Sequence, residues 1–398
     1  MGEVLKLKDV CEINGGYAFK STQYKAEGIP LIRIGDISEK LVEISDGSVY
    51  IDDDINKYGK FIIKKGDILI ALSGATTGKF GIYNYDEVAL LNQRVAKISP
   101  NELVYNNYLF HYMNKLKNVI YSKALGCAQP NISPNEISEL DIYIPNLETQ
   151  KKIAEVLDKV QELIDKRKEQ IKAMDELVKS RFIEMFGDPV NNPKGWEIKK
   201  LKDISTKILS GNTPKGGSQV YVDEGVLFLR SQNVWKNRLE LDDVAYIDQN
   251  THNKMANSSL KNRDILMTKT GRINTENSSL GRAAMYLGED DGANINGHVY
   301  LIRLQPNIIN EFILYILISN EYRDYIRSIC VGGIDKRQIN KEHLEEFPII
   351  FPPIELQKQF VDFTNQVEKL KSQMETSLKE LEDNFNSLMQ KAFKGELF

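Results

Sequence analysis

A glycine-rich loop is the first segment of this 398-residue chain whose residue types could do chemistry. Ser73-Gly74-Ala75-Thr76-Thr77-Gly78-Lys79-Phe80 places a lysine beside glycine-rich backbone, and such backbone can cradle a phosphate. The phosphate-loop motif needs four residues between its glycines and a Ser or Thr after the lysine. Here three residues separate the glycines and Phe80 follows the lysine. The sequence therefore does not predict nucleotide binding at this loop.

The sequence also lacks the residue spacing of a metal site and the motifs of a methyltransferase. The histidines and cysteines are scattered without the spacing of a zinc site: His111, His252, His298 and His343, with Cys11, Cys127 and Cys330. Phe351-Pro352-Pro353-Ile354 only imitates the Asn-Pro-Pro-aromatic motif of amino-methyltransferases, and no glycine-rich S-adenosylmethionine loop follows a first strand. We predict a chain that is not an enzyme by itself and that has no metal or cofactor of its own.

Polar and cationic side chains gather instead in turns between predicted strands, where loops on a rigid scaffold carry function. Arg, Asn and Gln can make paired hydrogen bonds to guanine or adenine edges, whereas Lys mostly holds phosphates. The DNA-binding candidates in the first half are Lys20, Tyr24, Arg33, Ser73, Thr76, Thr77, Lys79, Arg94, Gln129 and Asn131. Those in the second half are Lys215, Arg230, Gln232, Asn233, Lys269, Arg272, Arg282, His298, Lys336, Arg337 and Gln338. For each residue the alternative is an ordinary solvated loop side chain.

The two sets of candidates occupy matching places because the chain repeats itself. Gly66-Asp67-Ile68-Leu69 returns as Arg263-Asp264-Ile265-Leu266, and Asn131-Ile132-Ser133 returns as Gln338-Ile339-Asn340. Each copy reads as short strands broken by turn residues, and then as a helix. The helices are predicted over Tyr105 to Lys117 and Asn310 to Ile329. We therefore predict two similar α+β modules, at residues 1–146 and 188–353.

After each module, apolar residues recur at spacings of three and four on a strongly charged background. They are Ile153, Leu157, Val160, Ile164, Ile171 and Met174, and then Val367, Leu370, Met374, Leu378, Leu381, Phe385 and Leu388. Long helices are predicted over 147–187 and 354–398, and the stripe, sustained for about 35 residues, makes a rod of roughly 50 Å at 1.5 Å per residue. Neither helix can bury its stripe alone, so we expect an antiparallel coiled-coil pair with pseudo-twofold symmetry. The alternative is a helical hairpin packed within one domain.

Composition limits how DNA could be bound. The formal net charge is -4, and residues 1–145 carry 16 basic and 18 acidic side chains against 21 and 20 in residues 191–353. Neither half is a basic protein, so any DNA contact must come from local clusters. No apolar run approaches the roughly 18 residues that span a bilayer, and the N-terminus lacks a signal-peptide core. These features predict a cytoplasmic protein.

The order of these pieces resembles the specificity subunit of a type I restriction-modification system. The leads into the two long helices carry the resemblance, Ile144-Pro145-Asn146-Leu147-Glu148-Thr149-Gln150-Lys151 and Phe351-Pro352-Pro353-Ile354-Glu355-Leu356-Gln357-Lys358. The resemblance implies that each module is a target recognition domain for one half of a bipartite, asymmetric sequence in double-stranded DNA. It also implies that the helices set the spacer and help to dock two modification subunits.

The same resemblance assigns the chemistry to partners. Two adenine-N6 methyltransferase subunits would use S-adenosylmethionine, and two motor-nuclease subunits would use ATP with Mg²⁺. The chain itself would be non-catalytic. The alternative from a different class is a bivalent coiled-coil adaptor whose modules bind protein and not DNA.

Overall fold

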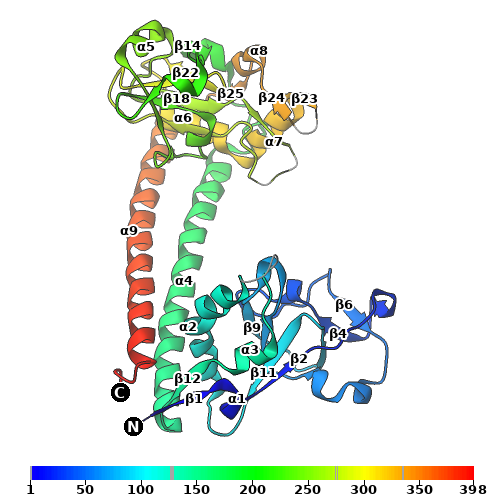
Figure 1. Ribbon diagram of the computed structural model, residues 1–398. Helices are drawn as coiled ribbons and strands as arrows, with labels where there is room; N and C mark the ends of the chain where they lie inside the picture. Colours follow the sequence, from blue (N-terminus) through cyan, green and yellow to red (C-terminus); the bar gives the residue numbers. More distant parts are fainter. Residues whose placement is uncertain (1, 126–129, 274, 276, 334–335) are drawn as a thin grey trace. The chain divides into compact units, whose positions relative to one another are not determined.

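The computed structural model describes residues 2–125, 130–273, 275, 277–333 and 336–398, which divide into two compact units. Unit 1 comprises Met1–Gln170 and Met374–Phe398, and unit 2 comprises Ile171–Gln373. Both units combine sheets with helices, and two long helices, α4 (Leu147–Phe186) and α9 (Ile354–Ala392), each contribute to both (Figure 1). The predicted α+β class with two modules and long helices is confirmed at this level.

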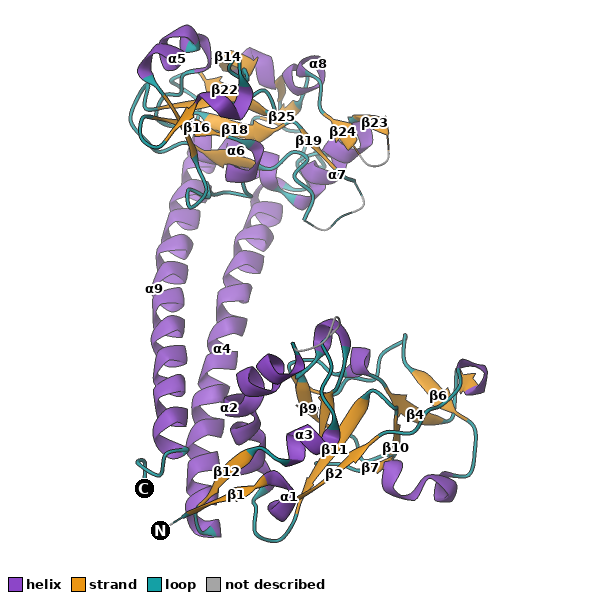
Figure 2. Ribbon diagram, viewed as in Figure 1, coloured by secondary structure: helices purple, strands orange, loops and turns teal. Residues whose placement is uncertain are grey.

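The first module is built on two five-stranded sheets (Figure 2). One has the order β2 (Cys11–Gly15), β11 (Val95–Pro100), β8 (Ile68–Ala71), β9 (Phe80–Ile82), β5 (Lys40–Leu41). The other has the order β3 (Tyr24–Lys25), β6 (Val49–Ile51), β4 (Ile29–Ile32), β10 (Ala89–Leu91), β7 (Ile62–Ile63). A separate pair joins β1 (Glu3–Lys6) to β12 (Asp141–Ile144). The helices are α1 (Leu7–Val10), α2 (Asn106–Ala124) and α3 (Pro134–Ser138).

The second module repeats the first four strands of each order, without a counterpart of β5 or β7 among the described strands. One sheet runs β14 (Ser205–Ser210), β22 (Val299–Leu304), β18 (Ile265–Thr268), β20 (Ala283–Met285), and the other runs β15 (Tyr221–Val222), β17 (Ala245–Ile247), β16 (Val226–Leu229), β21 (Ala293–Ile295). β13 (Ile198–Lys200) pairs with β25 (Pro348–Ile350) as β1 does with β12. The helices are α5 (Gln249–Lys254), α6 (Asn310–Ile318), α7 (Asn320–Ile329) and α8 (Lys341–Glu345). The sequence repeat is therefore a repeat of topology.

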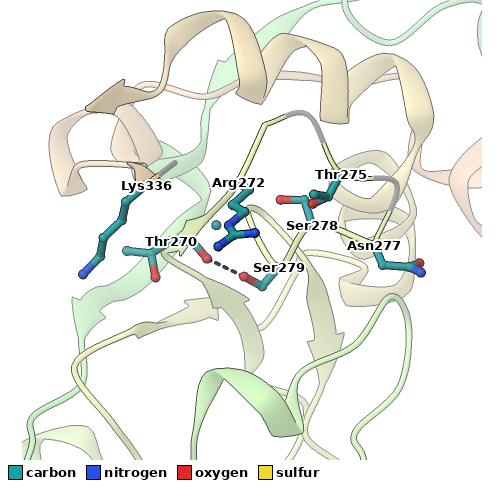
Figure 3. Close-up of a pocket in the computed structure, with 8 residues that line it drawn as sticks. Thr270, Arg272, Thr275, Asn277, Ser278, Ser279 and Lys336 are labelled. Carbon is teal, nitrogen blue, oxygen red and sulfur yellow. Dashed lines mark hydrogen bonds between the residues drawn. The ribbon is translucent and has the colours of Figure 1, made fainter. Parts of the chain in front are cut away.

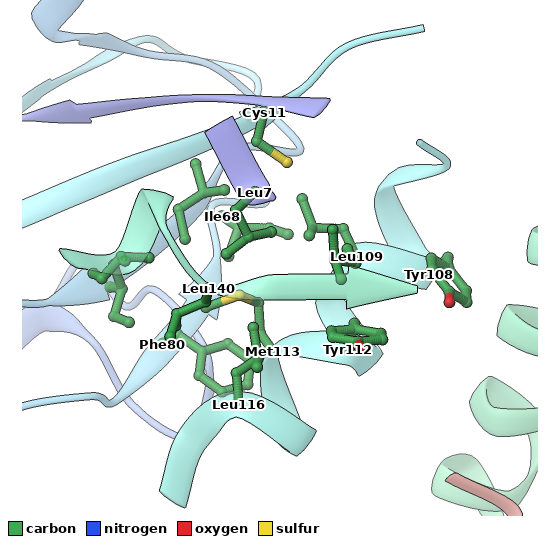
Figure 4. Packing of buried hydrophobic residues seen from close by; sticks show 14 of the residues in the cluster. Leu7, Cys11, Ile68, Phe80, Tyr108, Leu109, Tyr112, Met113, Leu116 and Leu140 are labelled. Carbon is green, nitrogen blue, oxygen red and sulfur yellow. The ribbon is translucent and has the colours of Figure 1, made fainter. Parts of the chain in front are cut away.

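A buried core joins sheet and helices in unit 1. Figure 4 draws part of it, where Leu7 and Ile68 pack with Leu109 and Met113 of α2. The apolar positions of α2 that recur at helical spacing are the ones that are buried. At about 1.5 to 3 kcal/mol per buried large apolar side chain, this packing is what positions the strand-end loops.

The repeated aspartate of each module holds a turn and an ion pair. Asp67 Oδ2 accepts from the Lys64 backbone N–H at 2.7 Å and lies 3.7 Å from Lys97 Nζ. In the second module Asp264 Oδ2 accepts from the Lys261 N–H at 2.7 Å and lies 2.7 Å from Arg303 Nη2. The preceding Gly66 has a φ of 91°, a conformation that favours glycine. This repeated motif is therefore structural.

Each long helix is tied to its module by a buried glutamine. Gln150 Nε2 donates to Pro145 O at 2.8 Å and to Leu103 O at 2.9 Å, and its Oε1 accepts from the Tyr105 N–H at 2.8 Å. The repeat partner, Gln357, donates to Pro352 O at 2.7 Å. Both glutamines are fully buried. The helix leads that carried the sequence resemblance thus fix where each helix begins.

The predicted apolar stripes are buried or half-buried, with one exception. Ile153, Leu157, Ile164 and Phe385 belong to the buried core of unit 1, and Val160, Leu378, Leu381 and Leu388 pack against it partly exposed. Val367 is buried in unit 2, and Ile171, Met174 and Met374 are half-buried. Leu370 departs from the prediction, because 48% of it remains exposed. Heptad spacing marks a stripe but does not say how wide the covered face is.

Some predicted boundaries were wrong. The single helix expected over Asn310 to Ile329 is two helices, because Ser319 is extended (φ -61°, ψ 153°) and its side chain caps α7 by accepting from the Tyr322 N–H. Helix α2 runs seven residues beyond the expected Lys117, to Ala124. Short 3-10 turns also interrupt the modules: Ser21–Gln23, Ile34–Asp36, Ile55–Phe61, Gly74–Thr76, Leu201–Ile204, Gly217–Val220, Ser231–Asn233 and Ala256–Ser258. Among the helices described here, none is long and apolar enough to cross a membrane.

Replacing the two repeat-related glutamines should have unequal effects. Gln150→Ala leaves a backbone N–H and two carbonyls without their partner, so the free energy of unfolding of unit 1 should fall by on the order of 3 kcal/mol. Gln357→Ala loses one such bond, and the expected loss in unit 2 is about 1 kcal/mol. Urea unfolding measures both, with the exposed neighbour Lys151→Ala as the control. Equal losses at the two sites would contradict this account of the helix leads.

Candidate nucleic-acid interface

In the second module, segments far apart in sequence meet at the end of β18. β19 (Thr270–Gly271), β24 (Lys336–Gln338) and β23 (Val331–Gly333) form a three-stranded sheet in which Thr270 pairs with Gln338 and Gly271 with Arg337. The Lys269 N–H donates to His298 O at 2.8 Å, and its carbonyl accepts from the Ile339 N–H at 2.9 Å. Predicted candidates brought together here are Lys269, Arg272, His298, Lys336, Arg337 and Gln338.

A polar hollow opens beside this small sheet (Figure 3). Ser279 Oγ donates to Thr270 O at 2.7 Å and so joins the next loop to β19. Apart from Gly271, every lining residue has a polar or cationic side chain; the lining comprises Thr270, Gly271, Arg272, Thr275, Asn277, Ser278, Ser279 and Lys336. Within the part of the chain that the structure describes, no group of three or more His, Cys, Asp or Glu could hold a metal ion. The hollow can offer hydrogen bonds and positive charge.

A tryptophan and several arginines adjoin the hollow. The Arg282 guanidinium carbon lies 3.9 Å from the Trp235 ring centroid, and that of Arg238 lies 5.5 Å from it. Arg282 Nε donates to Ser278 O at 3.0 Å, and Arg323 Nη2 donates to the same carbonyl at 3.2 Å. Burial, followed by the charge of Arg323, lowers the pKa of Arg282, yet arginine starts so high that it stays cationic near neutral pH. Arg282 was a predicted candidate, but Trp235 and the packing of two guanidinium groups on its ring, here called the cation platform, were missed from the sequence.

The first module brings the equivalent residues together. Ser73 pairs with Asn131, and Thr77 Oγ1 donates to Gly74 O at 2.7 Å and to Pro130 O at 3.1 Å. The Leu72 N–H donates to Arg94 O at 2.9 Å, which makes Arg94 the counterpart of His298. Thr76 and Lys79 lie half-buried on the same loop. The candidate Gln129 lies outside the described residues.

Several candidates serve the frame of the module. Arg33 Nη2 donates to Gly47 O at 2.8 Å, and its repeat partner Arg230 Nη2 donates to Asp243 O at 2.9 Å. Asn233 is only 1% exposed, and its amide donates to Glu240 O and Asp243 O.

Asn233 was predicted to contact DNA, but its side chain is enclosed and already hydrogen-bonded to the backbone of its own module. Thr77 is 5% exposed, and its hydroxyl likewise donates to backbone carbonyls of its own module. Residue type alone could not distinguish a side chain that bonds its own backbone from one that faces solvent.

The remaining candidates lie elsewhere. Lys20 and Tyr24 are at the β3 end of the second sheet, and Lys215 precedes β15 at the matching place. Gln232 is exposed, and its Nε2 donates to Asp243 Oδ2 at 2.6 Å. Trp235, by contrast, could have been noticed as one of only two tryptophans, set in a loop with Lys236 and Arg238.

The two modules share one topology. Each has a polar loop cluster at a strand end, and each leads into a long helix. These features define a two-site recognition protein. The family model described as "Type I restriction modification DNA specificity domain" matches residues 2–173 and 193–383. The chain belongs to this family.

Individual specificity subunits are also similar to this chain. The type I restriction enzyme EcoBI specificity subunit of Escherichia coli is 23% identical over 425 residues, which cover 99% of this chain and 85% of that protein. The StySPI specificity subunit of Salmonella potsdam is 23% identical over 393 residues, 93% and 82% of the two chains. Among solved structures, the type I S subunit from M. genitalium has a TM-score of 0.55 at 15% identity and covers 99% of this chain and 96% of its own. A chain from a study of type I R-M complex assembly has a TM-score of 0.61 at 19% identity, over 100% and 98%.

Arg230 should have a structural role, so that its replacement lowers the stability of unit 2. Arg230→Ala removes donors to Asp243 O from a largely covered side chain, so the free energy of unfolding of unit 2 should fall by about 1 to 2 kcal/mol. Amide hydrogen exchange in residues 231–243 should rise. Arg238→Ala is the matched control, because Arg238 is 67% exposed and pairs with Glu240, a contact worth at most about 1 kcal/mol. If amide hydrogen exchange in residues 231–243 is unchanged in Arg230→Ala, the structural role assigned to Arg230 is wrong.

Proposed function

We propose that this DNA specificity subunit reads a bipartite, asymmetric target in double-stranded DNA, with one half-site for each module. The observation that carries the proposal is that the two modules share one strand order but carry different side chains at the same loop positions. Arg94 and His298 are one such pair, and Lys79 and Arg282 are another. A common frame with unequal loops suits two unequal half-sites.

The discrimination of such a protein against a wrong DNA target would be the product of its discrimination at the two half-sites. Each wrong base pair typically costs about 1 to 3 kcal/mol, and well-separated positions add. Two modules that each read a few base pairs would then reject partial targets strongly. The loop clusters supply the required chemistry, because Arg and Asn or Gln recognise base edges and Lys holds phosphates.

We infer that α4 and α9 pair in antiparallel fashion and set the spacer between half-sites, with the pseudo-twofold symmetry of the repeat. Two contacts support this pairing. Within unit 1, Lys168 Nζ lies 2.8 Å from Glu382 Oε1, and within unit 2, Lys371 Nζ lies 2.5 Å from Asp175 Oδ1. As the residue number rises along α4, the partner's number falls along α9.

The catalytic steps are assigned to partner subunits. The proposed complex contains two adenine-N6 methyltransferase subunits, which use S-adenosylmethionine and dock in part on the long helices. Two motor-nuclease subunits that use ATP and Mg²⁺ would complete a restricting complex. The chain contributes target choice and positioning. Its proposed place of action is the cytoplasm, because its substrate is DNA.

A bivalent protein-binding adaptor is the competing function. It would bind no DNA in a salt-dependent manner even with its partners, whereas phosphate contacts make DNA affinity fall steeply with salt. The cation platform around Trp235 and the open polar hollow favour DNA, because both present positive charge or hydrogen-bond donors and neither is an apolar protein-docking face.

Methylome sequencing tests the proposal. A host that expresses this chain with its adenine methyltransferase partner should acquire one methylated-adenine motif made of two different half-sites and an unspecified spacer. A host that expresses the partner alone is the control and should lack that motif. A continuous motif, or no motif in a host where both proteins assemble, would contradict the proposed function.

The helices should act as the spacer ruler. Four residues inserted after Arg167, together with four at the facing part of α9, lengthen the pair by about 6 Å, close to two base-pair steps. The methylated motif should keep both half-sites and change only its spacer. Lys166→Gln, which removes an exposed pair with Glu162 but preserves helix length, is the matched control. A change of half-site bases would contradict separate roles for helices and modules.

A further inference from the structure

We propose that Arg272 reads a guanine in the second half-site and that it is the specificity-determining arginine of its module. The inference rests on the proposed function, because it requires the second module to bind a DNA duplex. It goes further by naming one residue and one base.

Several other arginines of the second module are already engaged. Arg230 and Arg282 donate to backbone carbonyls of their own module, and Arg337 Nη1 donates to Cys330 O at 3.1 Å. Arg238 Nε donates to Glu240 Oε1 at 2.6 Å. Arg272 differs: it is exposed, and no described residue makes a hydrogen bond or ion pair with its guanidinium. Its donors are available to a ligand.

The backbone that carries Arg272 is held firmly. Gly271 pairs with Arg337 in the small sheet, and a Cβ at Gly271 would lie only 2.3 Å from the Leu280 backbone nitrogen. Thr270 O accepts from Ser279 Oγ. The turn is thus packed too closely for any residue but glycine, so the base of the Arg272 side chain is fixed while its head stays free.

The surroundings suit a base edge. Figure 3 shows Arg272 over the hollow, between Lys336 on one side and Asn277 and Ser279 on the other. A guanidinium fork donates two parallel hydrogen bonds to guanine N7 and O6, whereas adenine presents a donor at the second position. Lys336 is exposed and offers a cation suited to an adjacent phosphate.

The first module lacks this donor at the equivalent place. Ser73 pairs with Asn131 as Thr270 pairs with Gln338, and Gly74 then corresponds to Gly271. The residue that follows is Ala75, which is exposed and has no side-chain donor. The same position on the same frame therefore reads guanine in one module only, which gives a direct source of target asymmetry.

The test uses the complete complex of this chain with its methyltransferase partner. Methylome sequencing defines the motif, and methylation rates are measured on duplexes that carry each base at every position of the second half-site. Arg272→Ala should relax one guanine position, with discrimination there reduced about 5- to 150-fold. The first half-site should be unchanged. Arg272→Lys should relax the same position, because a lysine keeps the charge but loses the fork.

Two controls separate base reading from general loss. Arg263→Ala removes an exposed arginine that pairs with Glu311, and it should leave every position of the motif unchanged. Lys336→Ala should weaken binding to all sequences alike and reduce the salt slope by about one. Thermal unfolding of each variant checks that the module still folds; if Arg272→Ala does not assemble, Arg272→Lys carries the test.

The outcomes are distinguishable. If the unmodified complex methylates a bipartite motif and both Arg272 variants keep full discrimination at every guanine of the second half-site, the assignment of Arg272 is overturned and the proposed function stands. A second half-site without guanine also overturns it. If the unmodified complex yields no bipartite motif, the proposed function itself fails.

Discussion

The constraint on which the rest of the structure depends is the junction between each module and its long helix. Gln150 and Gln357 are fully buried there, and each donates to the carbonyl of a proline that lies between its module's last strand and the long helix. A buried amide has no water to replace a lost partner, so the helix cannot change its starting direction without a substantial loss of stability. The module therefore determines where its helix begins, and an uninterrupted helix of 40 or 39 residues carries that direction onward.

From this junction outward, the two modules divide into a shared frame and unshared loops. The frame includes the paired charges Asp67 with Lys97 and Asp264 with Arg303, and the four-strand order that the corresponding sheets share. The loops differ in the chemistry they present. Ser38 in the first module corresponds to Trp235 in the second, since each backbone N–H bonds three residues ahead, to Leu41 and Arg238. Only the second module can therefore build an aromatic and guanidinium platform beside its hollow.

Much of the frame could be predicted from the sequence, and much of the site could not. Heptad spacing located the first long helix closely, predicted over 147–187 and observed over Leu147–Phe186, because helix periodicity is a local property. The break at Ser319 was missed, since a serine within an apolar pattern signals a cap only when its extended conformation is known. At the site, Asn233 and Arg272 look alike in sequence as polar loop residues. The first is enclosed by carbonyls and the second is open to solvent, a difference that arises from tertiary packing.

The central claim is that one frame, used twice, reads whatever its loops specify. The most direct measurement replaces residues 188–353 with a second copy of residues 1–146, keeps both long helices, and sequences the methylome of a host that also expresses the methyltransferase partner. Under the proposed pseudo-twofold pairing of the helices, two identical modules should methylate an inverted repeat of the first half-site, with the spacer preserved within a few base pairs. A motif that still contains the original second half-site, or a direct repeat of the first, would contradict the account.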